Sequence, residues 1–340
     1  MIYELNDTSK AEKLFAGMED DIWLRSCLEK IPDSKIYVTD LEHPRSAMAF
    51  LAGDVVYAGE PDAELAAFKP EGEIDIDIRD EAWEKLIKAY FPGGYMHTRY
   101  AFKTDTKFDR AKLEALVAML PAGYELRRID AEIYNMCLDD DLFEDAVMEF
   151  ESEEDYLERG RGFAILKDGE IVSVASSCCV YSSGIEVEID TAEEERRKGL
   201  ASAVGAKLIL SCLDDGLYPR WDAANPESMR LAEKLGYEFS HEYQSYWLSD
   251  VFDHVIKNPD RSKWDSFCGR YQRTDDPDRI YEIDRKGDDL YYHFVNLKGT
   301  HFDLRLFPIG EDTFGINEDD FTLVFSDGEM TLDGVACRKL

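Results

Sequence analysis

The segment VEIDTAEEERRKGLASAVGAKLIL, residues 187–210, decides the fold of this chain. Apolar and acidic side chains alternate over residues 185–190, which predicts a strand with one apolar face. Apolar side chains then recur every four residues from Leu200 to Cys212, which is the stripe of an amphipathic helix. The segment therefore predicts a strand, a polar loop and a helix, with Gly199 where the helix begins.

Three cations lie at the start of the predicted helix, namely Arg196, Arg197 and Lys198. A helix N-terminus carries partial positive charge and N–H groups without intrahelical partners, so cations are unfavourable there unless an anion shares the site. Gly199 has no Cβ and lets a ligand approach the backbone closely. Together these features predict a site for phosphate, and more specifically for a pyrophosphate. The alternative is a solvated basic turn whose cations pair with the acids of residues 193–195.

The spacing R-x-x-G-x-A over residues 196–201, after an apolar strand, resembles the acyl-CoA pyrophosphate loop of the GCN5-related N-acetyltransferase (GNAT) superfamily. A second strand around residues 218–222 and a second helix over residues 225–235 continue the likeness. The resemblance covers roughly residues 123–250. With its WDAAN segment and LAEKLGY ending, the arrangement is similar to a bacterial branch of GNAT proteins of poorly defined substrate. It implies a GNAT fold, in which helices flank a mixed central sheet.

The resemblance also implies that acetyl-CoA is the cosubstrate and that an amine, most simply a small primary amine, is the acceptor. The coenzyme A site that it implies is formed by Val187, Ile189, Arg196, Arg197, Lys198, Gly199, Leu200, Ala201, Ser202, Asn225 and Ser228. Backbone N–H groups from Arg197 to Ala201 would hold the pyrophosphate, and the strand at residues 187–189 would pair with pantetheine. The alternative role of Asn225 is that of an N-cap, since Pro226 follows it.

Two acids of the predicted central strand are candidates for the base that takes a proton from the acceptor. Acids on a covered strand are costly unless they face a cleft. Glu186 is the first choice, because the bacterial branch favours an acid there, and Glu188 is the second. The alternative is that both are solvated carboxylates on a loosely covered strand face.

The superfamily often places a tyrosine, the acid for the leaving thiolate, seven residues after the asparagine. This chain has Ala232 at that position. The departure favours a different class of function, namely a catalytically weak or inactive acyl-CoA-binding or scaffolding protein. Acetylation of protein amines is a third interpretation.

The composition predicts a folded protein of two or three domains, since 44% of its 340 residues are hydrophobic. The net charge of -34 argues against nucleic acid and anionic membranes as partners. It indicates either a cationic or amine-bearing acceptor or the general acidity of a cytoplasmic proteome. Seven scattered cysteines without a C-x-x-C pair predict reduced thiols in a cytoplasmic protein. The N-terminal residues show no signal-peptide pattern, no run approaches a membrane span, and the six histidines show no metal-ligand spacing.

Three regions are expected, and together they give an α+β fold class. Residues 1–122 form a mixed α/β domain, whose order of strands and helices suggests a diverged copy of the GNAT half without its glycine loop. Residues 123–250 form the GNAT domain. In this domain residues 139–160 predict one helix, which either walls the acceptor pocket or presents a solvated acidic face. The sequence leaves open whether the chain forms a homo-oligomer.

Residues 264–340 predict a small antiparallel β-barrel. Short strand-like runs follow one another closely and are separated by turns at Lys286-Gly287, Lys298-Gly299 and Asp327-Gly328. Pieces of this region, such as LRLFPIGEDTFGI at residues 304–316, resemble the lipocalin-like barrel appended to some bacterial penicillin-binding and β-lactamase-like proteins. No catalytic residue carries over, so this region is expected to serve interaction or stability.

Overall fold

A computed structural model describes residues 1–18, 22–32, 34–70, 72–92, 94–249, 255–256, 258–277, 279–295, 301–316, 322–326, 328–332 and 334–340. The chain forms two compact units. The first comprises Met1–Lys69, Asp75–Leu86 and Met96–Tyr246, and the second comprises Pro70–Ile74, Ile87–Tyr95 and Trp247–Leu340. A mixed α/β architecture with a separate closed barrel confirms the predicted fold class. The first unit continues across residue 122 without a break, although the sequence predicts a domain boundary there. The expected domain boundaries stay a prediction.

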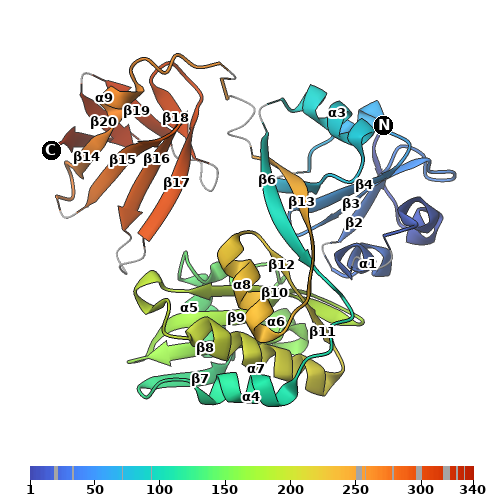
Figure 1. Ribbon diagram of the computed structural model, residues 1–340. Helices are drawn as coiled ribbons and strands as arrows, with labels where there is room; N and C mark the ends of the chain where they lie inside the picture. Colours follow the sequence, from blue (N-terminus) through green and yellow to red (C-terminus); the bar gives the residue numbers. More distant parts are fainter. Residues whose placement is uncertain are drawn as a thin grey trace. The chain divides into compact units, whose positions relative to one another are not determined.

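Two sheets carry the α/β part of the chain (Figure 1). The first has the order β1 (Tyr3–Glu4), β2 (Lys35–Val38), β3 (Ser46–Leu51), β4 (Asp54–Gly59), β5 (Ile74–Asp77), β13 (Phe239–Leu248), β6 (Tyr95–Phe102) and β12 (Asp222–Ala223). The second has the order β11 (Tyr218–Arg220), β10 (Gly184–Thr191), β9 (Glu170–Tyr181), β8 (Gly162–Lys167) and β7 (Tyr124–Arg128).

The α-helices of this part are α1 (Ile22–Glu29), α2 (Ala63–Ala66), α3 (Glu81–Tyr90), α4 (Arg110–Ala118), α5 (Ala131–Leu138), α6 (Glu153–Arg159), α7 (Leu200–Asp215) and α8 (Pro226–Leu235). Short 3-10 turns are η1 (Thr8–Lys10), η2 (Glu12–Phe15), η3 (Glu144–Ala146) and η4 (Glu193–Glu195). Within the described residues, no helix is both long and apolar enough to cross a membrane.

The two sheets share one order of pairing. Strands β2, β3 and β4 pair antiparallel, and the chain then crosses over through α2 so that β5 lies parallel to β4. Strands β8, β9 and β10 pair antiparallel in the same way, and the crossover through α7 places β11 parallel to β10. This repeat supports the hypothesis that residues 1–122 are a diverged copy of the second half.

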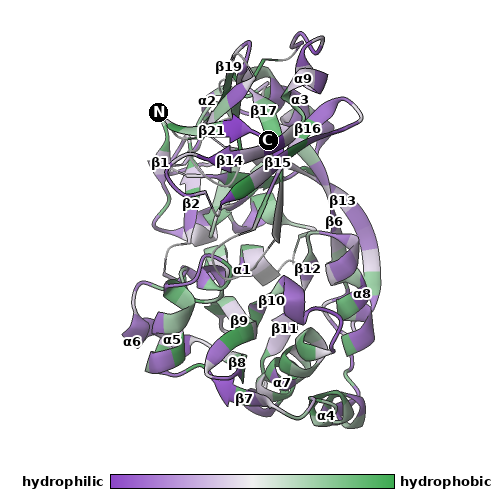
Figure 2. Ribbon diagram, turned by 90° about the vertical axis from the view of Figure 1, so that its left-hand side faces the viewer, coloured by the Kyte–Doolittle hydropathy of each residue, from purple (hydrophilic) through white to green (hydrophobic). Residues whose placement is uncertain are grey.

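Strands from the second half complete the first sheet. β13 pairs between β5 and β6, and the three strands lie side by side. β12 pairs antiparallel with β6, with Asp222 opposite Ala101. Figure 2 shows β13 as largely hydrophilic, whereas α7 is largely hydrophobic. The polar sequence of β13 explains why periodicity alone did not predict this strand.

The second sheet is covered by helices on both faces. Phe163 and Ile165 of β8 pack with α4 and α7 in one buried cluster. Their neighbours Ala164 and Leu166 point to the other face and pack with α5, η3 and α6. The predicted stripe of α7 is confirmed, since its apolar side chains lie in the first cluster. A Cβ added to Gly205 of α7 would lie 3.1 Å from Leu235 of α8, so glycine allows these helices to approach closely.

Local turn chemistry explains the hairpin between β8 and β9. Asp168 has a φ of 54° and Gly169 a φ of 92°. Two positive φ values in a two-residue loop belong to the turn type whose twist matches the flanking strands. The predicted hairpin at these two residues is therefore confirmed.

Two predicted elements are wrong. The helix expected over residues 139–160 is interrupted, because η3 and α6 are separated and the side chain of Ser152 caps α6 through the N–H of Asp155. The single strand expected over residues 218–222 is divided between two sheets. Trp221 is buried where β11 ends and β12 begins, and this side chain packs in the core with Tyr237 at a ring distance of 5.4 Å.

The second unit contains a closed antiparallel barrel, which confirms the predicted architecture of residues 264–340. The barrel strands are β14 (Gly269–Arg273), β15 (Ile280–Lys286), β16 (Asp289–Val295), β17 (His301–Pro308), β18 (Thr313–Gly315), β19 (Thr322–Ser326), β20 (Glu329–Leu332) and β21 (Val335–Lys339). The short helix α9 (Trp264–Phe267) adds two aromatic side chains to the barrel core. The likeness to lipocalin-like barrels stays a prediction, and the turn residues Lys298, Gly299 and Asp327 lie outside the described residues.

Glu195 is a buried acid that ties the start of α7 to the second sheet. Only 4% of this residue is exposed. Its carboxylate accepts hydrogen bonds from Lys167 Nζ at 2.7 Å, from Lys198 Nζ at 2.8 Å and from the hydroxyl of Tyr124. Although burial opposes the shift, these three bonds lower the pKa of Glu195 from 4.5 to about 2.

We expect Glu195→Gln to lower the free energy of unfolding at pH 7 by about 1–3 kcal/mol, since it removes a charged acceptor of several hydrogen bonds. A lowered pKa stabilises the fold fully above pH 4.5, and this contribution is lost as the pH falls toward about 2. Denaturant unfolding between pH 7 and pH 3 should therefore show a steeper loss of stability for the wild type than for Glu195→Gln. The exposed neighbour Glu194→Gln serves as control, and parallel pH curves for wild type and Glu195→Gln would contradict the assignment.

Candidate functional site

Strand β10 loses one of its two neighbours halfway along its length. It pairs with β9 from Gly184 to Thr191, but with β11 only over residues 184–186. Within the described part of the chain, residues 187–191 therefore have a ladder partner on one side only. Unpaired backbone N–H and C=O groups on a strand edge can pair with an extended ligand.

A β-bulge lies beside this opening. Glu186 pairs with Cys179 and Val187 with Ser177, which leaves Cys178 of β9 as an extra residue. Bulges bend a strand, re-aim side chains and are frequent next to active sites. Cys178 and Cys179 both line the cavity described below.

The loop before α7 presents backbone and cations to solvent. Arg197 and Gly199 adopt left-handed conformations, with φ values of 64° and 89°. No side chain caps α7, and residues 196–199 are all exposed. A Cβ added to Gly199 would meet no atom within 4 Å, so the space beside this glycine is open. The uncapped N–H groups, the open space and the cations together fit a diphosphate.

The equivalent loop of the first half lacks these features. Helix α2 has four residues, and the side chain of Asp62 accepts hydrogen bonds from the N–H groups of Glu64 and Leu65. A carboxylate cap occupies the position that an anionic ligand would take. Of the two crossover helices, only α7 keeps its N-terminal N–H groups without a side-chain cap.

The structure places the other predicted coenzyme A residues around this loop and the crossover through α7. Arg196 Nε donates a hydrogen bond to the carbonyl of Thr191 at 3.2 Å. Lys198 Nζ donates to Glu195, and this is the pairing that the alternative interpretation, a basic turn, expects. The side chains of Leu200 and Ser202 are buried, so these two residues face the loop through their backbone.

Asn225 is the N-cap of α8. Its side chain accepts from the N–H of Ser228 at 2.8 Å, and Pro226 occupies the first turn. The hydroxyl of Ser228 accepts from Trp221 Nε1 at 3.1 Å. The capping interpretation of Asn225 is confirmed, while a contact of either side chain to a ligand stays a prediction.

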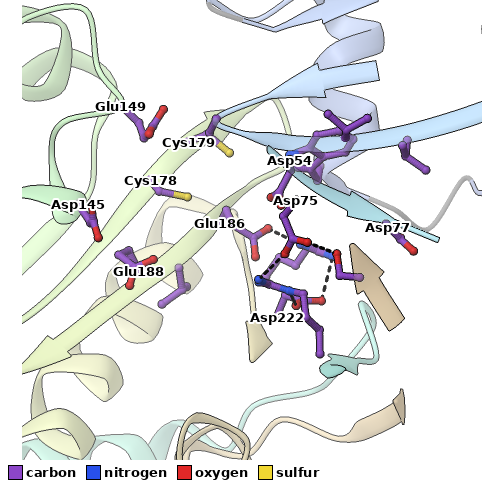
Figure 3. Close-up of a pocket in the computed structure, with 18 of the residues that line it drawn as sticks. Asp54, Asp75, Asp77, Asp145, Glu149, Cys178, Cys179, Glu186, Glu188 and Asp222 are labelled. Carbon is purple, nitrogen blue, oxygen red and sulfur yellow. Dashed lines mark hydrogen bonds and ion pairs between the residues drawn. The ribbon is translucent and has the colours of Figure 1, made fainter. Parts of the chain in front are cut away.

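A cavity of about 260 Å³ lies against residues 186–188 of β10 (Figure 3). Its walls come from β4, β5, β6, β9, β10, β13 and the segment around η3. Eight carboxylates line it, namely Asp54, Asp75, Asp77, Asp145, Glu149, Glu186, Glu188 and Asp222. Two guanidinium groups, those of Arg99 and Arg220, are the cations among the lining residues.

A chain of ion pairs crosses the wall of this cavity. Arg99 contacts Asp75 at 3.2 Å and Asp222 at 2.7 Å. Arg220 contacts Asp222 at 3.5 Å and Glu186 at 2.7 Å. Figure 3 shows this chain as the dashed lines around Asp75 and Asp222. The pairs connect strands of the first half with the central strand of the second half, so Glu186 is held as a paired carboxylate.

Glu188 has a different environment. Its carboxylate accepts a hydrogen bond from the adjacent N–H of Ile189 at 3.1 Å, and among the described residues it forms no ion pair. Burial, reinforced by the neighbouring Asp190, raises the pKa of Glu188 to about 8. Burial also raises the pKa of Asp190, to about 6. In Figure 3 Glu188 lies on the side of Asp145, away from the dashed chain.

The tyrosines near the site lie at other positions than the one that the superfamily pattern gives, seven residues after Asn225. Ala232 is fully buried in the core cluster and does not line the cavity against β10. The hydroxyl of Tyr237 donates to the carbonyl of Pro219, also in the core. Tyr243 of β13 lines the cavity, and its hydroxyl donates to Asp222 at 2.9 Å.

The first half supplies site residues that carry no recognisable motif. Asp54, Asp75 and Arg99 all line the cavity, together with Tyr243 from the unexpected strand β13. One signal was available, because the alternation in IDID over residues 74–77 places two acids on one face of a strand. The sequence does not show which cavity that face lines, because this depends on how the two halves contact each other.

Comparisons with known proteins agree with this geometry. The GNAT acetyltransferase family profile matches residues 12–246. YdfB, an uncharacterized N-acetyltransferase of Bacillus subtilis, is 27% identical over 263 residues, which cover 71% of this chain and 97% of that protein. The crystal structure of a GCN5-related N-acetyltransferase-like protein from Streptococcus suis is 39% identical, covers 71% of this chain and 98% of its own, and has a TM-score of 0.66. Since the family profile spans most of the sequence, the chain belongs to the GNAT acetyltransferase family.

Proposed function

We propose that the protein transfers an acetyl group from acetyl-CoA to an amine of a small molecule. The observation that carries this proposal is the contact between the acid-lined cavity and the open edge of β10 at residues 187–188. A donor paired along that edge and an amine in the cavity would meet at this strand. Membership of the family supports acyl transfer in general.

Acetyl-CoA, when bound, supplies the acetyl thioester. In this proposal the N–H groups from Arg197 to Ala201 hold its pyrophosphate, and the exposed cations of residues 196–198 attract it. The backbone of Val187 and Ile189 pairs with the pantetheine amides, as an added strand would. Asn225 and Ser228 lie at the start of α8 and shape this site through the capped turn.

Glu188 is the better candidate for the general base. An amine attacks a carbonyl only after it has lost its ammonium proton, and a base with a pKa near the working pH removes that proton most effectively. Glu188 has such a pKa and, within the part of the chain that the structure describes, forms no ion pair. Glu186 is the second candidate. Because it forms an ion pair with Arg220, its primary role in this proposal is to position the cavity wall.

The size of the cavity supports a small acceptor. Its volume of about 260 Å³ lies just below the roughly 300–1,000 Å³ of typical small-molecule pockets.

The second candidate function is a coenzyme A-binding protein without turnover, which the buried Ala232 favours. A free-thiol assay with acetyl-CoA and an amine panel separates the two, because amine-dependent thiol release requires acyl transfer.

Gly199→Glu should weaken coenzyme A binding at least tenfold, because a side chain is strained at a φ of 89° and the carboxylate repels a diphosphate. Isothermal titration with coenzyme A gives the affinity. Gly216→Glu is the matched control, since this glycine is also left-handed and open to solvent but ends the same helix. Unchanged affinity in Gly199→Glu, or no binding by the wild type, would reject the pyrophosphate site.

Glu188→Gln should lower kcat by about 10²–10⁴-fold and leave the affinity for coenzyme A nearly unchanged, since it removes a base but no donor contact. Glu186→Gln is measured beside it in the same thiol-release assay. A larger loss in Glu186→Gln than in Glu188→Gln would exchange the two roles. Full activity in both variants would exclude both carboxylates as the base.

The pH dependence provides an independent measurement. A general base works in its deprotonated form, and the pKa of Glu188 is raised to about 8. We therefore expect kcat/KM to rise with pH through about 8 in the wild type. In Glu188→Gln this limb should disappear, so that only the ionisation of the free amine remains. An identical profile in both proteins would assign the limb to another group.

A further inference from the structure

The first half repeats the open strand edge of the second half. β4 pairs with β5 only over residues 54–56, just as β10 pairs with β11 only over residues 184–186. Within the described part of the chain, residues 57–59 therefore have no ladder partner on the side of β5. They correspond to residues 187–189 of β10, which have none on the side of β11.

The register of the two ladders identifies the equivalent residues. Both ladders begin at the first residue of the central strand, so Tyr57 corresponds to Val187 and Gly59 corresponds to Ile189. In the proposed function the backbone of the latter two pairs with the pantetheine amides. An extended amide ligand would therefore have its counterpart in the first half along Tyr57 and Gly59.

A side chain of α3 occupies this edge of β4. The indole Nε1 of Trp83 donates a hydrogen bond to the carbonyl of Gly59 at 3.2 Å. The indole ring also stacks on Tyr57, with 4.7 Å between the ring centroids. Trp83 is only 3% exposed. The indole thus satisfies a strand-edge carbonyl that β5 leaves without a ladder partner, and buried backbone groups need such a partner.

Trp83 stands where the second half has Ser228. The helices α3 and α8 each follow the parallel strand of their half, and each has ten residues. Asp80 accepts a hydrogen bond at 3.1 Å from the N–H of Trp83, three residues along the chain. Asn225 accepts one at 2.8 Å from the N–H of Ser228, also three residues along. The same helical position therefore carries an indole in one half and a hydroxymethyl group in the other.

We propose that the first half retains a second edge for an extended amide such as pantetheine, and that Trp83 closes this edge by occupying the place of the ligand. This inference rests on the proposed function for the role of the β10 edge. The indole N–H replaces an amide of the ligand at the carbonyl of Gly59. Together with the carboxylate cap from Asp62, it leaves β10 and α7 as the donor site, so each chain binds one coenzyme A.

Titration calorimetry with coenzyme A counts the donor sites. We expect one site per chain in the wild type, and we expect Gly199→Glu to weaken all of the measured binding, since the first half stays closed. Two sites per chain, of which one keeps its affinity in Gly199→Glu, would overturn the inference.

Equilibrium dialysis with labelled pantetheine tests the closed edge directly. Pantetheine lacks the diphosphate, so the cap at Asp62 does not oppose it. Trp83→Ser, which introduces the residue of the second half, should bind one equivalent more per chain than the wild type. Trp83→Phe is the matched control, because it keeps a ring in the edge and should bind no additional equivalent. A folded Trp83→Ser without the additional equivalent would overturn the inference.

Nuclear magnetic resonance of the wild type provides a measurement that needs no opened variant. The chain has five tryptophans, and the indole N–H signal that disappears in Trp83→Phe belongs to Trp83. We expect this buried, hydrogen-bonded N–H to exchange slowly with water and to keep its position when coenzyme A is added. A shift of this signal that grows with a second equivalent of coenzyme A would overturn the inference.

The two binding experiments distinguish failure of this inference from failure of the proposed function. No coenzyme A binding by the wild type, with an additional pantetheine equivalent in Trp83→Ser, contradicts the donor site at β10 and supports the closed edge of β4. One coenzyme A site without that additional equivalent supports the donor site and overturns the inference. One coenzyme A site together with the additional equivalent supports both.

Discussion

The separation of β10 from β11 after Glu186 is the constraint on which the site depends. The chain leaves β11 at Arg220, buries Trp221 and joins the other sheet through Asp222. This crossing exposes one edge of β10 and, in the same step, places Arg220 and Asp222 beside Glu186. The opening for a ligand and the ion pairs that border it are therefore two results of one change of sheet.

Burying the charged groups of these ion pairs costs desolvation free energy, so each buried charge needs several partners. Charges taken out of water cost more than a single contact returns, unless each group has several partners. Here each guanidinium contacts two carboxylates, and Asp222, with 5% of its side chain exposed, also accepts from Tyr243. The network joins strands of both halves, so it aligns the walls of one cavity. Removing one member would leave its partners charged and buried.

The duplicated topology also shows why the two halves differ in chemistry. Both contain a crossover from a central strand to a parallel neighbour. In the first half a short helix is capped by Asp62, whereas α7 begins at a left-handed glycine without a cap. Helix length and cap thus distinguish the two crossovers, because α2 is capped by a carboxylate whereas the N–H groups that begin α7 have no side-chain cap. Glu195 and its lysines hold that loop against the second sheet.

Local chemistry in the sequence determined the strand, loop and helix of residues 187–210, the hairpin at Asp168-Gly169, the cap at Asn225 and the existence of a C-terminal barrel. These features depend on periodicity, on φ preferences and on side chains that bond to nearby backbone, all of which act within a few residues. The same locality explains the errors, since nothing near residue 221 indicates that the chain changes sheets there. The acids Asp54 and Asp75, the arginines between them and Glu186, and strand β13 meet only because the two halves pack together. Which carboxylates pair with Arg99 and Arg220 is a property of that packing, so the tertiary structure alone decided how the cavity wall is paired.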